Sequence, residues 1–390
     1  GKVVIKPKYD IVRDFKEGMA VVKYNGYWGV IDRNGKEVLI PSGYIISITD
    51  FQEGVAIFQV TGSRDFVLLY PDGTWGYPPH ASAIESFSEG LAAFKQGKLW
   101  GYIDKKGNVV IEPKFTRADP FKNGLAIVSV VGGDGRSIKF GVIDKQGNWV
   151  VKAQYDHIYE FSEGLAAVVE SEVYGMYQRE GYIDTTGKLV IPMNYRPMTF
   201  PEAGIFSEGL AAVSDGKETG FINTKGEMVI RHEFQRATLF KNGYSIIQGQ
   251  WINDTNVIDK NGNLVFESGF NAIEEFSDGM ARVELYEAYR SNKIGYINDK
   301  FEIAIPPTND YSNAGHFHNG MAWVQMKDSG LYGYIDKTGK LAIKDKYLTA
   351  GDFSDDGIAY VEEDNYDGTR TVGYINKTGK YVWSTTKRNM

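Results

Sequence analysis

Short apolar segments of three or four residues, separated by polar turns rich in glycine, recur along the whole chain. In one stretch these segments are residues 91–94, 100–103 and 109–111. Segments of this length bounded by Gly and Asp are typical of β-strands, and no apolar run approaches the roughly 20 residues that span a bilayer. The first and third segments are apolar at consecutive positions, which indicates that both faces of each strand are covered. The pattern predicts an all-β fold without a membrane span.

A glycine motif repeats ten times and sets the organisation of the chain. The motif reads Phe-x-(Glu/Asp/Asn)-Gly, followed by an apolar residue and then Ala or Ser, and its tenth copy has one extra residue before the glycine. The glycines lie 34 to 45 residues apart, at Gly18, Gly54, Gly90, Gly124, Gly164, Gly209, Gly243, Gly279, Gly320 and Gly357. Ten repeats of about 38 residues therefore cover residues 1–390, which predicts a single repeat domain.

A second motif, Trp-Gly-Tyr-Ile-Asp-Lys-Lys-Gly at residues 100–107, follows the first motif and recurs with variations in the other repeats. Its Asp-x-x-Gly end has the chemistry of a type I turn closed by a left-handed glycine, with the Asp side chain accepting a backbone hydrogen bond. In the eighth repeat Phe301 occupies the position of this last glycine. A bulky residue is strained in the left-handed region, so we expect the turn there to be rebuilt.

Each repeat thus contributes three predicted antiparallel strands, and it is too small to bury its own apolar faces. We expect the repeats to stack as an open β-solenoid or superhelix. The alternative is a closed, β-propeller-like ring, although propellers typically have four strands per blade and four to eight blades. There are eleven candidate third strands against ten of each other type, whereas a ring closed by exchanging a terminal strand would leave none over. Gly1 falls in the middle of a repeat, so we expect a trimmed or processed end.

The two motifs in register resemble those of the WG-repeat (KWG-repeat) family of mainly bacterial proteins, and the resemblance covers essentially all 390 residues. The Trp of the signature is present at Trp28 and Trp100 and is replaced in the other repeats, which argues against an obligatory ligand-binding role. The resemblance implies a β-repeat scaffold that mediates interactions, often in surface or multidomain proteins. It carries no family-wide catalytic residues to transfer to this sequence.

Charge and composition exclude several classes of function. The chain has 43 basic and 50 acidic residues, a net charge of −7, which argues against nucleic acid as the partner. It has no cysteine, so a thiol nucleophile, a disulfide framework and a Cys-ligated metal are excluded. The lack of cysteine suits an exported bacterial protein as well as many cytosolic ones. We favour an extracytoplasmic or cell-surface location over the cytoplasm.

The repeated carboxylates are interpreted as turn residues, and we predict that the protein is not an enzyme. The position held by Glu89 in the third repeat is Asn123 in the next one, and an amide cannot replace a general acid. His316 and His318 would point the same way on an extended segment if Phe317 is inward, but two ligands do not make a metal site. We therefore expect no catalytic residue, no metal and no cofactor.

Residues inserted between the first and second strands of some repeats carry the candidate binding residues Tyr174, Tyr177, Trp251, Tyr286, Tyr289 and Tyr366. Rigid aromatic side chains with a polar tip suit recognition surfaces, although they could equally form packed pairs across the hairpins. The leading hypothesis is a non-enzymatic repeat scaffold that mediates protein–protein interaction. The alternative is a glycan or cell-wall binding module in which the hairpin aromatics stack on sugar faces.

Overall fold

A computed structural model describes residues 4–6, 8–62, 66–171, 178–198, 204–249, 255–286 and 292–388. The chain divides into two compact units, an N-terminal unit of Gly1–Pro197 and a C-terminal unit of Met198–Met390. All regular elements of the described ranges are β-strands, and no helix occurs among them. The prediction of an all-β fold is confirmed.

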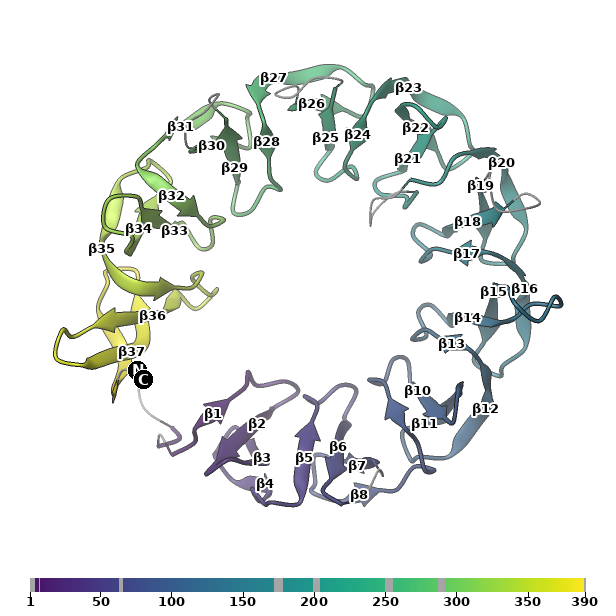
Figure 1. Cartoon of the computed structure of the whole chain (residues 1–390), viewed down its shortest axis with the longest axis horizontal. Helices are drawn as coiled ribbons and strands as arrows, with labels where there is room; N and C mark the ends of the chain where they lie inside the picture. Colours follow the sequence, from purple (N-terminus) through teal and green to yellow (C-terminus); the bar gives the residue numbers. More distant parts are fainter. Residues whose placement is uncertain are drawn as a thin grey trace. The chain divides into compact units, whose positions relative to one another are not determined.

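The N-terminal unit consists of five small antiparallel sheets, each formed by four strands that are consecutive in the chain (Figure 1). The strands are β1 (Ile11–Val12), β2 (Met19–Tyr24), β3 (Tyr27–Asp32), β4 (Glu37–Leu39), β5 (Ile45–Ile48), β6 (Ala56–Val60), β7 (Phe66–Leu69), β8 (Trp75–Gly76), β9 (Ala83–Ile84), β10 (Leu91–Gln96), β11 (Leu99–Asp104), β12 (Val109–Phe115), β13 (Arg117–Ala118), β14 (Leu125–Val131), β15 (Ile138–Asp144), β16 (Trp149–Tyr155), β17 (His157–Ile158), β18 (Leu165–Ser171), β19 (Gln178–Asp184) and β20 (Leu189–Tyr195).

The C-terminal unit has sheets of three, four, four and seven described strands, again in chain order. Its strands are β21 (Leu210–Ser214), β22 (Thr219–Asn223), β23 (Met228–Phe234), β24 (Arg236–Ala237), β25 (Tyr244–Gln248), β26 (Thr255–Asp259), β27 (Leu264–Phe270), β28 (Ala272–Ile273), β29 (Met280–Leu285), β30 (Lys293–Asn298), β31 (Ile303–Thr308), β32 (Tyr311–Ala314), β33 (Met321–Met326), β34 (Tyr332–Asp336), β35 (Leu341–Ala350), β36 (Ile358–Asp364), β37 (Thr369–Asn376) and β38 (Tyr381–Arg388).

The prediction of three strands per sheet misses a short fourth strand. After β12 the chain forms the two-residue strand β13, which pairs with β14 of the following repeat (Arg117 with Ser129, Ala118 with Val128). Each four-stranded sheet therefore begins with the end of the preceding repeat. In the C-terminal unit β35 is continuous and belongs to both repeats that it joins, which gives the seven-stranded sheet. A strand of two residues is too short for a periodic pattern to reveal it.

The Phe-x-Glu-Gly motif forms the tight turn before the long strands. In the third repeat Glu89 and Gly90 have φ of 52° and 88°, and Ser88 and Leu91 exchange backbone hydrogen bonds of 2.8 and 3.1 Å. Two central residues with positive φ define a type I′ turn, in which Gly is free of strain and Asn is well tolerated. The interpretation of the repeated acidic and amide residues as turn formers is confirmed.

The glycine of the Trp-Gly pair is required by a close approach between two strands. A Cβ atom on Gly101 would lie 2.3 Å from the carbonyl oxygen of Ile111, because β12 carries a bulge opposite this position. The seventh repeat has Asn256 instead of this glycine, and its register differs, since Asn256 pairs directly with Glu267. The altered pairing makes room for the side chain.

The turn at Phe301 is retained, so the expectation that it is rebuilt is wrong. Phe301 has a φ of 61°, and its N–H donates to the carbonyl of Asn298 over 2.9 Å, as Gly107 does to Asp104. The ring is buried and packs on Phe266, Phe276 and Tyr244 at centroid distances of 4.7 to 6.2 Å. Burial of an aromatic ring offsets the cost of the left-handed backbone.

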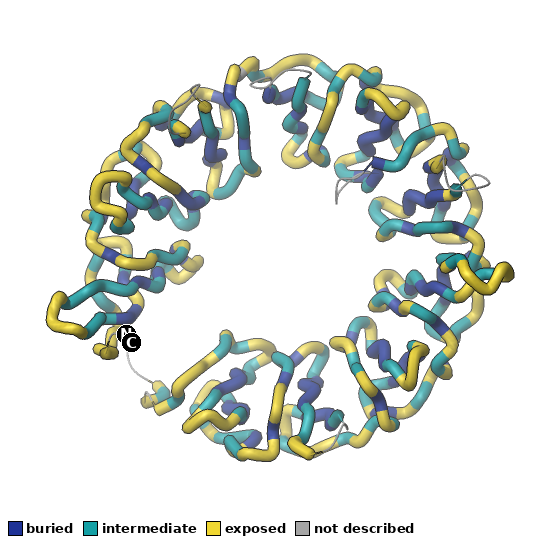
Figure 2. The backbone as a smooth tube through the Cα atoms, viewed as in Figure 1, coloured by how far each residue is buried: buried dark blue, intermediate teal, exposed yellow. Residues whose placement is uncertain are grey.

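Buried residues are concentrated on the long strands of each sheet (Figure 2). The hydrophobic core clusters combine residues of neighbouring sheets, and so lie at the junctions, the contacts between one sheet and the next. At the junction of β9–β12 with β13–β16, Tyr102 packs on Phe121 with ring centroids 4.8 Å apart, and both side chains are buried. Equivalent ring pairs occur at two junctions of the C-terminal unit, Phe221 with Phe240 and Tyr296 with Phe317, and between the two repeats of the seven-stranded sheet, Tyr334 with Phe353, each at 4.9 Å. Neighbouring repeats therefore cover each other, as their size requires.

The turn carboxylates hold consecutive sheets together. The Glu53 carboxylate accepts hydrogen bonds from the backbone N–H groups of Glu89 and Gly90 in the next repeat, at 2.5 and 2.8 Å. It also forms an ion pair with Lys105, with 3.1 Å between Oε2 and Nζ. We call this arrangement the turn clamp. It recurs where Glu17 accepts from Gly54, Glu89 from Gly124, Glu208 from Gly243 and Asp278 from Gly320.

We predict that Glu89→Gln lowers the free energy of unfolding of the N-terminal unit by about 1 kcal/mol at pH 7, because a charge-assisted hydrogen bond and the ion pair with Lys145 are weakened. The N–H of Gly124, and then Lys145, hold the pKa of the Glu89 carboxyl below its ordinary value of 4.5. A depressed carboxyl pKa stabilises the folded state above the unfolded pKa, and this stabilisation is lost as the pH falls through the folded pKa. The difference between the two proteins should therefore shrink as the pH falls below 4.5 and vanish once the pH is below the folded pKa, which urea denaturation at several pH values measures.

Glu112→Gln is the matched control for this experiment, since Glu112 is exposed on β12. We expect its denaturation curve to follow that of the unmodified protein at each pH. An equal loss of stability in both variants, or none in Glu89→Gln at pH 7, would contradict the role of the turn clamp.

Candidate functional site

The carboxylates of the Phe-x-Glu-Gly motif connect consecutive repeats in the structure, because they accept backbone hydrogen bonds from the next repeat. In the ninth repeat an amide, Asn319, occupies this position and contacts the next repeat through different bonds. It donates to the carbonyls of Ser354 and Asp355 over 3.1 Å each and accepts from Lys377 over 2.5 Å. An amide can thus also link two repeats, through a different set of bonds. This agrees with the interpretation of the series as structural.

The two neighbouring histidines contact different partners. Phe317 between them is fully buried, while His316 lies 3.4 Å from Glu274 and His318 lies 3.7 Å from Asp352. Across the described ranges no group of three or more His, Asp or Glu side chains could hold a metal ion. Nor does this part of the chain contain a helix long and apolar enough to cross a membrane.

Four of the six candidate hairpin aromatics, Tyr174, Tyr177, Trp251 and Tyr289, lie outside the described residues. Tyr366 lies between β36 and β37 with 85% of its surface exposed and a φ of 59°, and its N–H donates to Asp364 over 2.9 Å. Tyr286 follows β29 and is 45% exposed, and its hydroxyl donates to Glu284 over 2.8 Å. The structure does not bring Tyr286 and Tyr366 together, since they belong to different sheets.

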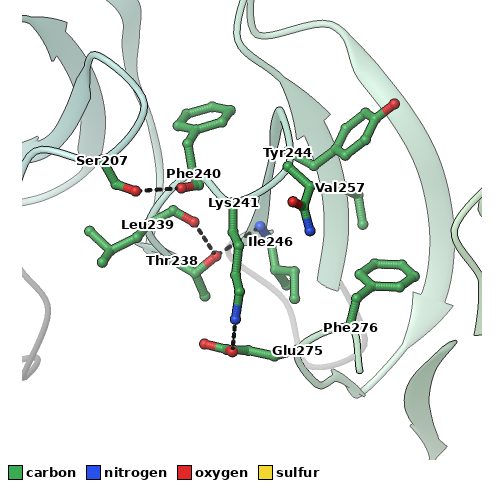
Figure 3. A pocket seen from close by; sticks show the side chains of 11 residues that line it. Ser207, Thr238, Leu239, Phe240, Lys241, Tyr244, Ile246, Val257, Glu275 and Phe276 are labelled. Carbon is green, nitrogen blue, oxygen red and sulfur yellow. Dashed lines mark hydrogen bonds and ion pairs between the residues drawn. The ribbon is translucent and has the colours of Figure 1, made fainter. Parts of the chain in front are cut away.

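A hollow of about 370 Å³ opens between the sheets β24–β27 and β28–β31 (Figure 3), and sequence analysis does not predict it. Ile246, Val257 and Phe276 give it apolar walls. At its edge Lys241 extends to Glu275, with 2.7 Å between Nζ and Oε2, and both side chains are mostly exposed. We call it the junction hollow. A second hollow of about 590 Å³ adjoins it and is lined in addition by Glu274, Ser277, His316 and His318.

The residue pair at the junction hollow differs from that of several other repeats. In the third and sixth repeats a small residue on the first long strand faces a ring on the second, as in Ala93 with Tyr102 and Ala212 with Phe221. Here the facing pair is Ile246 with Val257, and the fourth repeat has the same combination in Ile127 with Val142. The pair is therefore a variant of the frame that occurs in more than one repeat.

A buried arginine connects the second hollow to the hairpin of Tyr286. Arg282 in β29 has 8% of its surface exposed and donates to the carboxylates of Glu274 and Glu284. Glu274 in turn lies next to His316, and Glu284 accepts the Tyr286 hydroxyl. The equivalent residue of the third repeat is Ala93, so this charged network belongs to the eighth repeat and not to the common frame.

Glu180 is a buried carboxyl group that sequence analysis does not single out as functional. It stands on β19 at the position of Trp28 and Trp100, and none of its surface is exposed. It pairs across the sheet with Val169 on one side and Tyr195 on the other. Burial raises the pKa of the Glu180 carboxyl to about 8, and the neighbouring Tyr182 side chain opposes only part of this shift.

A family model described as "WG containing repeat" matches the sequence in ten segments, residues 1–28, 28–62, 71–100, 100–133, 140–174, 181–196, 220–248, 257–287, 294–328 and 332–366. No curated protein sequence matches the chain.

Solved structures with similar chain paths share little sequence with this protein. A crystal structure of the eukaryotic initiation factor matches with 8% identity and a TM-score of 0.46, over 96% of this chain and 97% of that one. A crystal structure of Kluyvelomyces marxianus Hsv2 matches with 10% identity and a TM-score of 0.31, over 63% and 91%. A streptogramin B lyase matches with 16% identity and a TM-score of 0.21, over 72% and 92%. Scores this low support no inference about function.

We predict that Glu180→Gln changes how the stability of the N-terminal unit depends on pH. Because the pKa is about 8 in the folded protein and ordinarily 4.5, the folded state binds the proton more tightly than the unfolded state does. The unmodified protein should therefore lose stability steadily as the pH rises from 4.5 to 8, and Glu180→Gln should lack this loss. Urea denaturation at several pH values in this window measures the two slopes, with Glu112→Gln as the control that keeps the original slope. Parallel profiles of Glu180→Gln and the unmodified protein would show that the buried carboxyl is not protonated in the folded state.

Proposed function

Because the chain belongs to the WG-containing-repeat family, whose motifs match segments along most of its length, we propose that it is a non-enzymatic scaffold that binds a protein partner. The observation that carries the proposal is the division between repeated and unrepeated residues. The repeated acidic groups, such as Glu53 and Asp278, are engaged in turn clamps between sheets. Residues that vary between repeats include Tyr286 and Tyr366, which are exposed on hairpins.

The exposed hairpins support a recognition role. Tyr366 is presented at the end of the β36–β37 hairpin, and Tyr286 is linked through Glu284 to the buried Arg282. Rigid aromatic side chains held by a polar network lose little conformational entropy when they are covered by a partner. Hairpins that extend from a sheet are suited to this purpose, because the strands of that sheet fix where each tip lies.

We propose in addition that the row of sheets is an open array and not a ring closed by strand exchange. Each four-stranded sheet is formed by four strands that are consecutive in the chain. In the last sheet the outer strand is β38, which pairs with β37. No sheet with four described strands needs a strand from the other end of the chain. Small-angle scattering of the intact chain tests this proposal.

The protein-scaffold proposal is tested by capture with the intact chain as bait against an extract of the producing cells, followed by crosslinking. We expect a partner protein in stoichiometric amount, with crosslinks concentrated at the hairpin tips, such as residues 132–137 between β14 and β15 and residues 365–368 between β36 and β37, and at the edge of the junction hollow. Few crosslinks should lie along β12 and β16. Catalytic turnover that is lost on changing one acidic residue, or crosslinks spread evenly over the strands, would contradict the proposal.

A glycan-binding role is the second candidate, and the 85% exposure of Tyr366 is the observation that favours it. If exposed tyrosines stack on sugar rings, binding to bacterial cell-wall polysaccharide should fall at least tenfold in Tyr366→Ala. Tyr102→Phe serves as the control, because that ring is buried at a junction. A glycan array without a specific signal from the unmodified protein would rule this role out.

A further inference from the structure

We propose that a hollow at the junction of the sheets β1–β4 and β5–β8 binds an extended, proline-containing segment of the protein partner. The inference rests on the proposed function, since it names the part of a partner that the chain would bind. The hollow has a volume of about 550 Å³, which lies within the range of ligand-binding sites. We call it the aromatic hollow, because Tyr44, Phe58 and Trp75 line it.

The aromatic hollow combines a buried part with an exposed part. Leu39 and Phe58 belong to the hydrophobic core, with 7% and 2% of their surface exposed. Ile40, Tyr44 and Trp75 line the hollow as well and are 69%, 73% and 48% exposed. Large apolar side chains that gather at the surface in this way mark a place where a protein meets a partner or a ligand.

Contacts within the N-terminal unit hold the walls of the aromatic hollow in place. The Trp75 ring packs edge-on against Phe58, with the centroids 5.4 Å apart. The backbone carbonyl of Tyr44 accepts a hydrogen bond of 2.7 Å from the N–H of Thr61. A site whose walls are already ordered loses less conformational entropy when it binds. The hollow is therefore formed before an occupant arrives.

The polar groups of the lining favour an uncharged occupant that accepts hydrogen bonds. No lining residue is charged, and none has a carboxylate or amide oxygen in its side chain. A charged group would lose its hydration there without gaining a partner of opposite charge. The lining can instead donate through the indole N–H of Trp75 and the hydroxyls of Ser42 and Tyr44. These three side chains donate to no residue that the structure describes.

A proline-containing segment of the partner matches this combination. It offers carbonyl oxygens to the three donors, and its prolines have no N–H that would need an acceptor. Its polyproline II conformation exists before binding, and segments of this kind dock in grooves lined by aromatic side chains. A strand-forming segment would instead bring N–H groups, for which the lining side chains offer only hydroxyl oxygens.

The proposal is tested on the intact chain with two peptides, followed by NMR of the backbone amides and indole N–H groups. The first peptide is acetyl-Pro-Leu-Pro-Pro-Leu-Pro-amide, and the second has alanine in place of each proline. We expect saturable shifts at residues 39–45 and 73–76, with a dissociation constant of roughly 0.1 mM for the proline peptide. The alanine peptide should bind about tenfold more weakly, because its backbone is not ordered beforehand.

The comparison of the two peptides needs no variant of the protein. Equal binding of both would indicate a site for any apolar segment and would overturn the proposal. Shifts that do not saturate, or that lie outside the aromatic hollow, would overturn it as well.

Trp75→Phe removes the indole N–H and keeps a ring beside Phe58, so the proline peptide should bind about fivefold more weakly to this variant. Trp149→Phe is the matched control. Trp149 also lies two residues after a turn glycine with positive φ, and it packs edge-on against the buried ring of Phe115. The control should bind the peptide as the unmodified chain does. Unchanged binding in Trp75→Phe, or equal weakening in both variants, would overturn the proposal.

The two proposals fail in distinguishable ways. If a saturating amount of the proline peptide leaves partner capture unchanged, the proline-segment site is refuted while the scaffold function stands. If the proline peptide binds as expected but the intact chain captures no partner, the aromatic hollow stands as a binding site and the scaffold function is refuted.

Discussion

The junction between consecutive sheets is the contact on which the whole structure depends. A sheet of four short strands with apolar residues on both faces cannot remain folded alone, so each sheet needs the next one. The turn clamp adds specific hydrogen bonds to this apolar contact. In the type I′ turn of the third repeat, Ser88 and Leu91 bond to each other, which leaves the N–H groups of Glu89 and Gly90 to the carboxylate of Glu53. A carboxylate therefore satisfies donors that the turn itself cannot satisfy.

Because the turn clamps and ring pairs recur, single junctions can change without loss of the frame. Phe301 replaces a glycine and becomes part of a cluster of rings, and Asn256 replaces another glycine by a shift of register. The pair Ile246 and Val257 stands where the third repeat has Ala93 and Tyr102, and both residues line the junction hollow. The same regularity that stabilises the array thus allows individual repeats to acquire features of their own. Recognition in a repeat protein is expected to reside in such departures.

Several features could be predicted from the sequence because they depend on neighbours close along the chain. The ten repeats, the positive φ at the motif glycines and the Asp-x-x-Gly turns all follow from the spacing of Gly, Asp and aromatic residues. The strand β13 could not be predicted, because two residues carry no periodicity. The retained turn at Phe301 could not be predicted either, because its strain is offset by rings from distant parts of the chain. Of the candidate site, only Tyr286 and Tyr366 fall on described residues.

The sequence by itself determined the all-β class, the repeat length and the turn chemistry, since these are local properties of the backbone and its glycines. Only the tertiary structure decided which groups meet at a junction, because those residues lie about 20 to 40 positions apart and belong to different repeats. The burial of Glu180, the network of Arg282 and the hollow beside Phe276 are consequences of such meetings. Their energetics depend on the shape and solvent exposure of the space between two sheets, which no single strand encodes.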